Sequence, residues 1–128
     1  MYSAQSNPYQ QYKQQSIMTM TQGEMLTQLY DGAIKQLSKG IQLIDAKEFM
    51  PANEALQKAQ LIVNYLRQIL DDQYKVSESL DALYEYFGHR IVQANIRKDT
   101  APLHEIIAML TELRDTFATA DRANRTQF

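Results

Sequence analysis

Hydrophobic side chains recur every three or four residues along most of the chain, beginning just after residue 20. This spacing places them on one side of a helix, whereas a half-buried strand would alternate with a period of two. No β-rich alternating run competes, so the pattern predicts an all-α protein with four helices. The predicted apolar stripes are Leu26, Leu29, Ala33, Leu37, Ile41 and Ile44; Ala52, Leu56, Ala59, Val63, Leu66 and Leu70; Leu80, Leu83, Tyr84, Phe87, Ile91 and Ala94; and Leu103, Ile106, Leu110, Leu113 and Phe117.

Polar capping residues and prolines mark where the predicted helices begin. Thr21 and Glu24 form a Thr-x-x-Glu capping box, in which each side chain pairs with the other's free backbone N–H. Proline is tolerated in a first helical turn, where the N–H groups have no helical partner. These signals place the later starts at Pro51, at Ser77, and at Asp99 or Thr100 followed by Pro102.

The helix lengths and loops also predict the overall organisation. Helices of about 20 residues joined by short loops pack most simply as an antiparallel up-down bundle. We therefore expect an N-terminal segment over residues 1–20, a four-helix bundle over 21–120 and a frayed polar tail over 121–128.

Two glycines fall inside the first predicted helix. Each costs roughly 1 kcal/mol relative to alanine in a helix interior. We attribute Gly32 to the close approach of another backbone and Gly40 to tolerated sequence drift.

Some apolar residues lie on the side of a helix that the core does not use. At about 100° per residue, Leu61 and Tyr65 lie nearly opposite the apolar stripe of the second helix, and Val92 and Ile96 lie nearly opposite that of the third. Single exposed apolar residues are common, and a central helix would be covered on both sides. Pairing at i and i+4 on both helices also suits the docking of a partner helix. Periodicity alone leaves these readings open.

The N-terminal segment is rich in glutamine and tyrosine and has no helical periodicity. Tyr9 and Tyr12 follow Pro8, and the apolar residues Ile17 and Met20 come just before the first helix. Aromatic side chains generally need an apolar surface to rest on. The segment is therefore either a disordered tail or a movable strap over an apolar groove, and the pattern does not choose between them.

Composition narrows the function further. The chain has 128 residues, enough for one domain, and a net charge of −2, which provides no excess of positive charge for nucleic acid. It has no cysteine, which excludes disulfides and thiol chemistry. No signal peptide is visible, and the longest apolar run, residues 106–110, is far shorter than the roughly 20 residues of a membrane span. We expect a soluble, cytoplasmic protein with no membrane insertion.

Candidate catalytic or metal-binding residues are few. His104 and Glu105 begin like a His-Glu-x-x-His zinc motif, but Ala108 occupies the position of the second histidine. Glu85 and His89 are four residues apart, not the three of a di-iron Glu-x-x-His motif. We therefore expect no enzyme, no metal and no cofactor.

Three motifs carry a family resemblance. Leu83 to Asp99 contains Leu-Tyr-x-Tyr and Ala-Asn-x-x-x-Asp, residues 29–33 read Leu-Tyr-Asp-Gly-Ala, and residues 7–12 read Asn-Pro-Tyr-x-x-Tyr. In this order and spacing the chain resembles the FliS family of flagellar secretion chaperones over nearly its whole length. It departs from the family at Gln22 and Gly23, where a proline is frequent, and at His89, where a second basic residue is frequent. The matching positions are Leu29, Tyr30, Asp31, Gly32, Tyr84, Tyr86, Arg90, Asn95 and Asp99.

The resemblance implies a function. A FliS-like protein would be an ATP-independent cytosolic export chaperone that binds the C-terminal segment of flagellin, prevents premature filament assembly and supports type III flagellar secretion. It would be a monomer or weak homodimer, with an export-gate component or an anti-sigma factor as further partners. The alternatives are a homodimeric helical scaffold and an adaptor for an amphipathic helix of a regulatory protein. The candidates for client contact are Tyr9, Tyr12, Ile17, Met20, Leu61, Tyr65, Val92 and Ile96.

Overall fold

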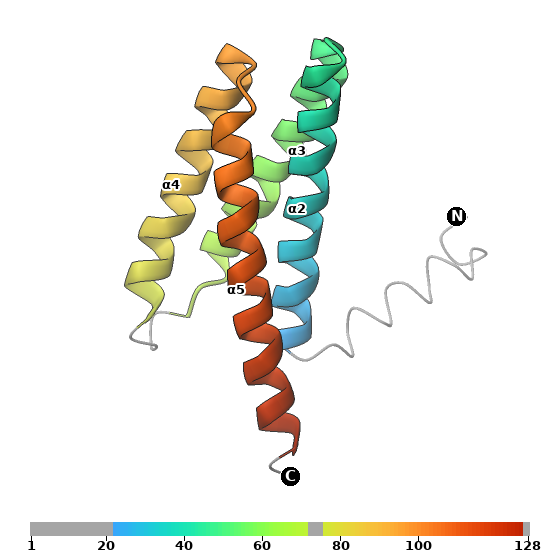
Figure 1. Ribbon diagram of the computed structural model, residues 1–128. Coiled ribbons are helices and arrows are strands. Elements are labelled where there is room, and N and C mark those ends of the chain that lie inside the picture. Colours follow the sequence, from blue (N-terminus) through green and yellow to red (C-terminus); the bar gives the residue numbers. More distant parts are fainter. Residues whose placement is uncertain (1–21, 72–75, 127–128) are drawn as a thin grey trace, which may run out of the picture.

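The computed structural model describes residues 22–71 and 76–126, and these form four α-helices and no strand (Figure 1). The predicted all-α four-helix bundle is confirmed. The N-terminal candidates Tyr9, Tyr12, Ile17 and Met20 lie outside the described residues, as does Thr21 of the predicted capping box. The helices are α2 (Gln22–Asp45), α3 (Phe49–Gln68), α4 (Val76–Arg97) and α5 (Ala101–Thr126).

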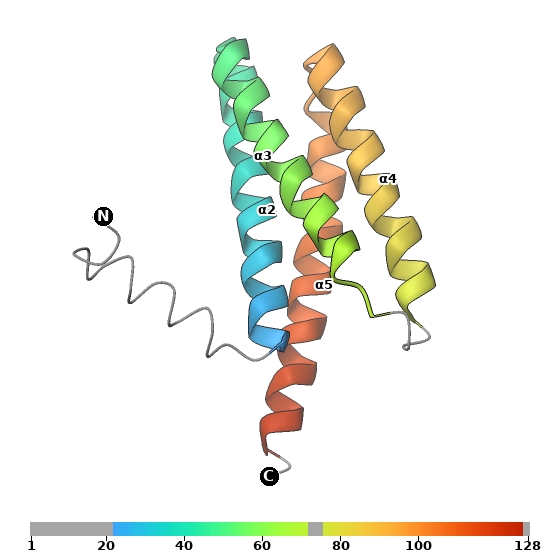
Figure 2. The ribbon, with the colours of Figure 1, turned by 180° about the vertical axis from the view of Figure 1, so that it is seen from behind.

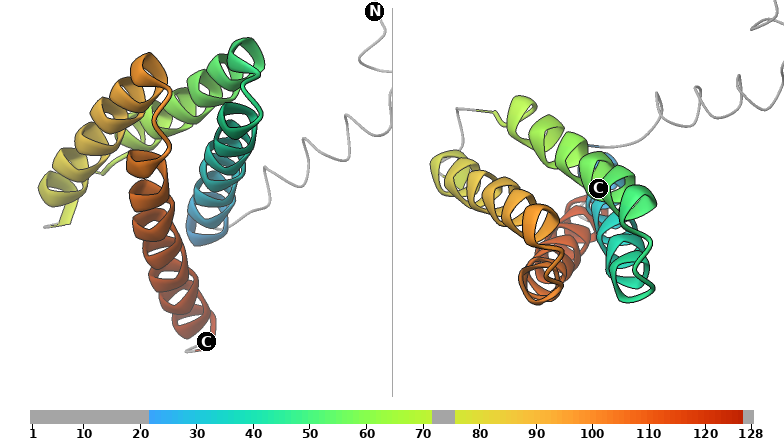
Figure 3. Two further views of the ribbon diagram at one scale, coloured as in Figure 1. Left: turned by 45° about the horizontal axis from the view of Figure 1, so that its top comes forward. Right: turned by 90° about the horizontal axis from the view of Figure 1, so that it is seen from above.

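Consecutive helices run antiparallel, so the bundle is of the up-down type (Figure 1). Helix α2 packs extensively against α3 and α5, whereas the contact between α4 and α5 is the smallest of the four neighbouring pairs. Viewed from above, α3 and α4 form one side of the bundle and α2 and α5 the other (Figure 3). The face made by α3 and α4 is turned toward the viewer in Figure 2.

The predicted apolar stripes form the core. Leu37, Leu56, Phe87 and Ile106 are fully buried, one from each helix, which confirms the helical periodicity as the source of the fold. Burial of such side chains stabilises by about 1.5–3 kcal/mol each. Other stripe residues are only half-buried and pack against this core: Leu26, Leu29, Leu70, Leu80, Leu83, Leu113 and Phe117.

Two tight turns close the same end of the bundle. Lys47 after α2 and Lys98 after α4 both adopt left-handed backbone conformations, with φ of 60° and 53°. The Glu48 N–H donates to the Leu43 carbonyl at 2.8 Å, and the Asp99 N–H donates to the Ala94 carbonyl at 3.1 Å. These are the backbone bonds of Schellman motifs, which use helix carbonyls that would otherwise lack partners.

The helix boundaries differ from the prediction in two places. Ser77 does not begin α4 but is its second residue, and its hydroxyl donates to the Asp71 carbonyl in the α3–α4 connection. Helix α5 continues to Thr126, whereas the predicted bundle ends at residue 120. No glycine or proline follows Pro102, so nothing in the local sequence stops the helix there. Pro51 lies in the first turn of α3, as expected.

Helices α2 and α3 pack tightly at Gly40. A Cβ atom added there would lie 2.6 Å from Leu56 Cδ2, and Leu56 is fully buried. Gly32 also faces α3, where an added Cβ would lie 3.3 Å from Ile62 Cδ1. The assignment of Gly40 to sequence drift was therefore wrong, because packing leaves no room for a side chain.

Candidate functional site

The four apolar residues placed opposite the core are exposed. The exposed fractions are 68% for Leu61, 45% for Tyr65, 38% for Val92 and 77% for Ile96. Their role in binding a client stays a prediction.

The two apolar strips, Leu61 with Tyr65 and Val92 with Ile96, are offset along the bundle. The Asn95 amide donates to Asn53 Oδ1 at 2.7 Å, so Ile96 lies near the level of Asn53. Leu61 is eight residues further along α3 than Asn53, about 12 Å at 1.5 Å per residue. The strips on the two helices are therefore not level with each other.

Polar contacts join α3 and α4 along the line where the two helices pack. Arg67 Nε donates to Asp81 Oδ1 at 2.8 Å, and Arg67 Nη2 lies 3.5 Å from Glu85 Oε2. The hydrogen bond from Arg67 holds the pKa of Asp81 below its usual value, and the same bond raises the pKa of Arg67. We call the line of α3–α4 contacts from Asn53–Asn95 to Arg67–Asp81 the polar seam.

Two more exposed apolar residues lie at the closed end of the bundle. Phe49 and Met50, in the first turn of α3, are 45% and 82% exposed. The predicted stripe of this helix begins at Ala52 and does not include them. Two large apolar residues directly before Pro51, outside the heptad pattern, were the available signal.

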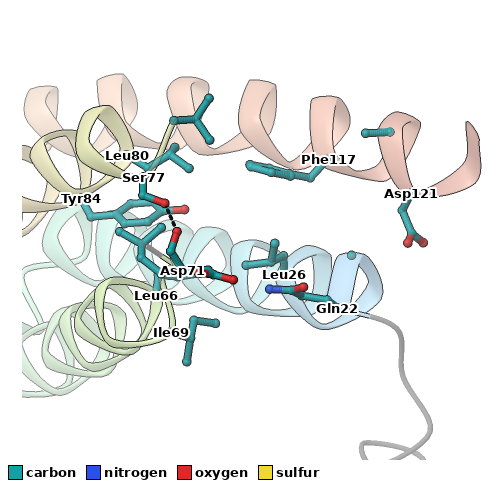
Figure 4. Close-up of a pocket in the computed structure, with 14 residues that line it drawn as sticks. Gln22, Leu26, Leu66, Ile69, Asp71, Ser77, Leu80, Tyr84, Phe117 and Asp121 are labelled. Carbon is teal, nitrogen blue, oxygen red and sulfur yellow. Dashed lines mark hydrogen bonds between the residues drawn. The ribbon is translucent and has the colours of Figure 1, made fainter. Parts of the chain in front are cut away.

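The opposite end of the bundle holds an open cavity of about 380 Å³ (Figure 4). Its wall is mostly apolar, and Gln22, Asp71 and Asp121 supply polar groups. The apolar side chains come from all four helices and include Leu26, Leu66, Leu70, Leu80 and Phe117. Each belongs to a predicted core stripe, so periodicity alone could not show that the core ends in a cavity.

A buried pair of tyrosines lies beside this cavity. The hydroxyls of Tyr30 and Tyr84 are hydrogen-bonded, and the two residues are 0% and 1% exposed. The Tyr30 ring stacks on Phe117 with 5.8 Å between centroids. Burial is the main cause that raises the pKa of both tyrosines, so both stay neutral at physiological pH. These family positions build the core rather than the surface.

Other family positions hold α5 against its neighbours. Asp31 Oδ1 accepts a hydrogen bond from Arg114 Nη1 at 2.8 Å, which joins α2 to α5. The Tyr86 hydroxyl donates to Glu105 Oε1 at 2.7 Å, and Arg90 Nε lies 3.5 Å from the same oxygen. The hydrogen bond to Glu105 is the main cause that raises the pKa of Tyr86.

The Ala-Asn-x-x-x-Asp motif shapes the turn between α4 and α5. Ala94 supplies the carbonyl for the Schellman bond, and the Asp99 carboxylate accepts the Ala101 N–H at 3.1 Å, as predicted for a cap of α5. Lys98 Nζ donates to the Asn95 carbonyl at 2.8 Å. All of these contacts are within the chain.

Nothing among the described residues resembles a catalytic or metal centre. They contain no group of three or more His, Cys, Asp or Glu side chains that could hold a metal ion, and both His89 and His104 are exposed. No described helix is long and apolar enough to cross a membrane. The described residues place the protein in the class of all-α up-down bundles, with an apolar cavity at one end and exposed apolar residues on α3 and α4.

Comparison with known proteins assigns the chain to one family of this class. The family model described as Flagellar protein FliS matches residues 5–124. The chain is 38% identical over 119 residues to the Flagellar secretion chaperone FliS of Bacillus subtilis, covering 93% of this chain and 90% of that protein. It is 30% identical over 122 residues to the protein of that name from Escherichia coli (91% and 90% coverage) and 28% identical over 122 residues to that from Salmonella typhimurium (91% and 90% coverage).

The chain therefore belongs to the FliS family, as the motifs in the sequence indicated. FliS proteins form a family of chaperones of flagellar secretion and not a family of enzymes.

Proposed function

We propose that this protein is a cytosolic, ATP-independent export chaperone that binds the C-terminal segment of flagellin and keeps it unassembled until secretion. The observation that carries the proposal is the exposure of Leu61, Tyr65, Val92 and Ile96 on the outer faces of a FliS-family bundle. Two apolar residues spaced i and i+4 give a helix a short docking strip for an amphipathic partner. A flagellar secretion chaperone has such a partner in the subunit that it escorts.

A long interface suits this task better than a single pocket. Ordering about 30 client residues costs on the order of 45 kcal/mol at about 1.5 kcal/mol per residue. Offsetting that cost at about 25 cal/mol per Å² requires roughly 1,800 Å² of buried apolar surface. The exposed apolar residues are distributed over both α3 and α4, which supports binding by wrapping.

The N-terminal segment belongs to the same proposal. Residues Tyr9, Tyr12, Ile17 and Met20 form a strap that competes with the client or clasps it. The end cavity supports this role because Gln22, the first described residue, lies in its wall.

Calorimetric titration with the last 40 or so residues of the flagellin from the same organism tests the proposal. Stoichiometric binding with a large negative heat-capacity change is expected, because coupled folding and binding buries much apolar surface. Leu61→Asp and Ile96→Asp should each weaken binding while the far-ultraviolet circular dichroism spectrum is unchanged. Ala108→Asp is the matched control, since Ala108 is exposed on α5, away from both strips.

Absence of binding by folded protein free of bound peptide would refute the flagellin assignment. A mass that rises with concentration, together with loss of that rise in Ile96→Asp, would instead support the homodimeric scaffold. Deletion of residues 1–19 separates the two strap roles: affinity for the flagellin segment rises if the strap competes and falls if it clasps the client.

A further inference from the structure

The start of α2 and the last turns of α5 meet beside the end cavity. Gln22 and Gly23 of α2 line this cavity together with Asp121 of α5. The Asp121 side chain points from α5 toward the first turn of α2 (Figure 4). Two segments that are far apart in the sequence therefore form one wall of the cavity.

Gly23 leaves the space that the Asp121 side chain fills. A Cβ atom added at Gly23 would lie 2.5 Å from both Cγ and Oδ1 of Asp121, and 2.6 Å from its Cβ. Ordinary contacts between carbon atoms are about 3.5–4.0 Å long. A side chain at position 23 would therefore push Asp121, and the end of α5 with it, away from α2 by about 1 Å or more.

The backbone of α2 does not itself require glycine at position 23. Gly23 has no positive φ, so other residues can adopt its conformation. Glycine in a helix is also less favourable than alanine. The close approach of Asp121 is therefore the structural reason for glycine at this position.

The charge of Asp121 suits the place that its side chain occupies. The N–H groups in the first turn of a helix have no helical partner, and the helix dipole puts a partial positive charge there. Glu24 already provides one acidic group in the first turn of α2, and Asp121 adds a second from another helix. Packing and electrostatic attraction thus hold the same side chain against α2.

We propose that the contact between Gly23 and Asp121 is a latch that keeps the end cavity narrow. It joins α2 to α5, whereas the contact between α5 and α4 is the smallest of the four neighbouring pairs. Leu26 of α2 and Phe117 of α5 are half-buried and line the same cavity. Separation of the two helix ends exposes both side chains further, so the latch controls how much apolar surface this end of the bundle presents.

A double-mutant cycle tests whether the two positions share one space. Gly23→Ala should lower the Tm of the otherwise wild-type protein by about 4 °C, because the methyl group overlaps Asp121. In the Asp121→Gly background it should not lower the Tm, since the carboxylate and the Cβ that it would meet are both absent. Gly88→Ala is the matched control: an added Cβ there has no neighbour within 4 Å, so its effect should be the same in both backgrounds. Equal effects of Gly23→Ala in the two backgrounds would overturn the proposal.

Distances between spin labels test whether the latch sets the width of the cavity. The chain has no cysteine, so pairs of introduced cysteines can be labelled without background. Gln28 on α2 and Thr119 on α5 are exposed near the latch, and Gln42 and His104 are an exposed pair on the same helices near the closed end. In pulsed electron paramagnetic resonance, Gly23→Leu should lengthen the distance between labels at 28 and 119 by about 2 Å and leave the distance between 42 and 104 unchanged.

The remaining outcomes of the distance measurement count against the latch. No change at either pair would show that Asp121 does not hold α5 in place. An equal change at both pairs would show that the substitution disturbs the whole bundle rather than one end. Neither experiment uses the flagellin segment, so the latch can fail while the chaperone proposal stands, and the chaperone proposal can fail while the latch stands.

Discussion

The same substitution at two helical glycines should have opposite effects on stability. Gly88→Ala adds a methyl group where an added Cβ has no neighbour within 4 Å, so only the helix propensity and the entropy of the unfolded chain change. We expect the free energy of unfolding to rise by about 1 kcal/mol. A change of that size corresponds to roughly 4 °C in Tm for a domain near this length.

Gly40→Ala receives the same gain from propensity but meets a different environment. Its Cβ would lie 2.6 Å from Leu56 Cδ2 and 3.1 Å from Leu56 Cγ, and Leu56 is fully buried and cannot swing into solvent. Overpacking of this kind costs about 1–3 kcal/mol. After the gain of about 1 kcal/mol, the net change is a loss of up to about 2 kcal/mol.

Urea denaturation followed by circular dichroism measures both variants, with equal m-values required for a direct comparison. The variants should differ by about 1–3 kcal/mol, with Gly88→Ala the more stable. Leu56→Ala in the Gly40→Ala background should cost less than in the wild type, because the two residues share the same space. Equal shifts for the two glycines would refute the reasoning, since it rests wholly on the difference between their surroundings.

Three further predictions concern the polar contacts. Tyr84→Phe should cost about 1–3 kcal/mol in chemical denaturation because the Tyr30 hydroxyl stays buried without its partner, and replacing both tyrosines by phenylalanine should recover part of that loss. The ion pair of Arg67 and Asp81 stabilises the fold above the unfolded-state pKa of Asp81, and this stabilisation is lost as pH falls through the lowered folded-state pKa. Between about pH 5 and pH 2, the wild type should therefore lose more stability than Arg67→Met. A matching pH dependence in both proteins would contradict this. Asp99→Ala should lower the stability by about 1 kcal/mol through loss of the cap on α5, and no change in Tm would show that the bond is unimportant.

Local periodicity predicted the helices and most of the core because each apolar stripe is a property of one segment. Leu37, Leu56, Phe87 and Ile106 could be assigned to the core without knowing their neighbours. The exposure of Leu61 could be predicted in the same way, from its angle around α3.

Features made by two segments were not predictable from periodicity. Tyr30 and Tyr84 are 54 residues apart in sequence, and their pairing depends on the register between α2 and α4. The offset of the apolar strips likewise depends on the α3–α4 register, which the bond between Asn53 and Asn95 reveals. The end cavity arises from where four stripes stop relative to one another, a property that no single stripe contains.

The position of the two Schellman turns has a mechanical consequence. Both turns, at Lys47 and Lys98, lie at one end of the bundle, and the cavity lies at the other (Figures 1 and 4). Helix α4 has 22 residues and is therefore about 33 Å long. A tilt of only about 5° about its fixed end displaces its other end by roughly 3 Å over that length. Such a tilt would change the width of the cavity by about the diameter of a water molecule while leaving both turns in place.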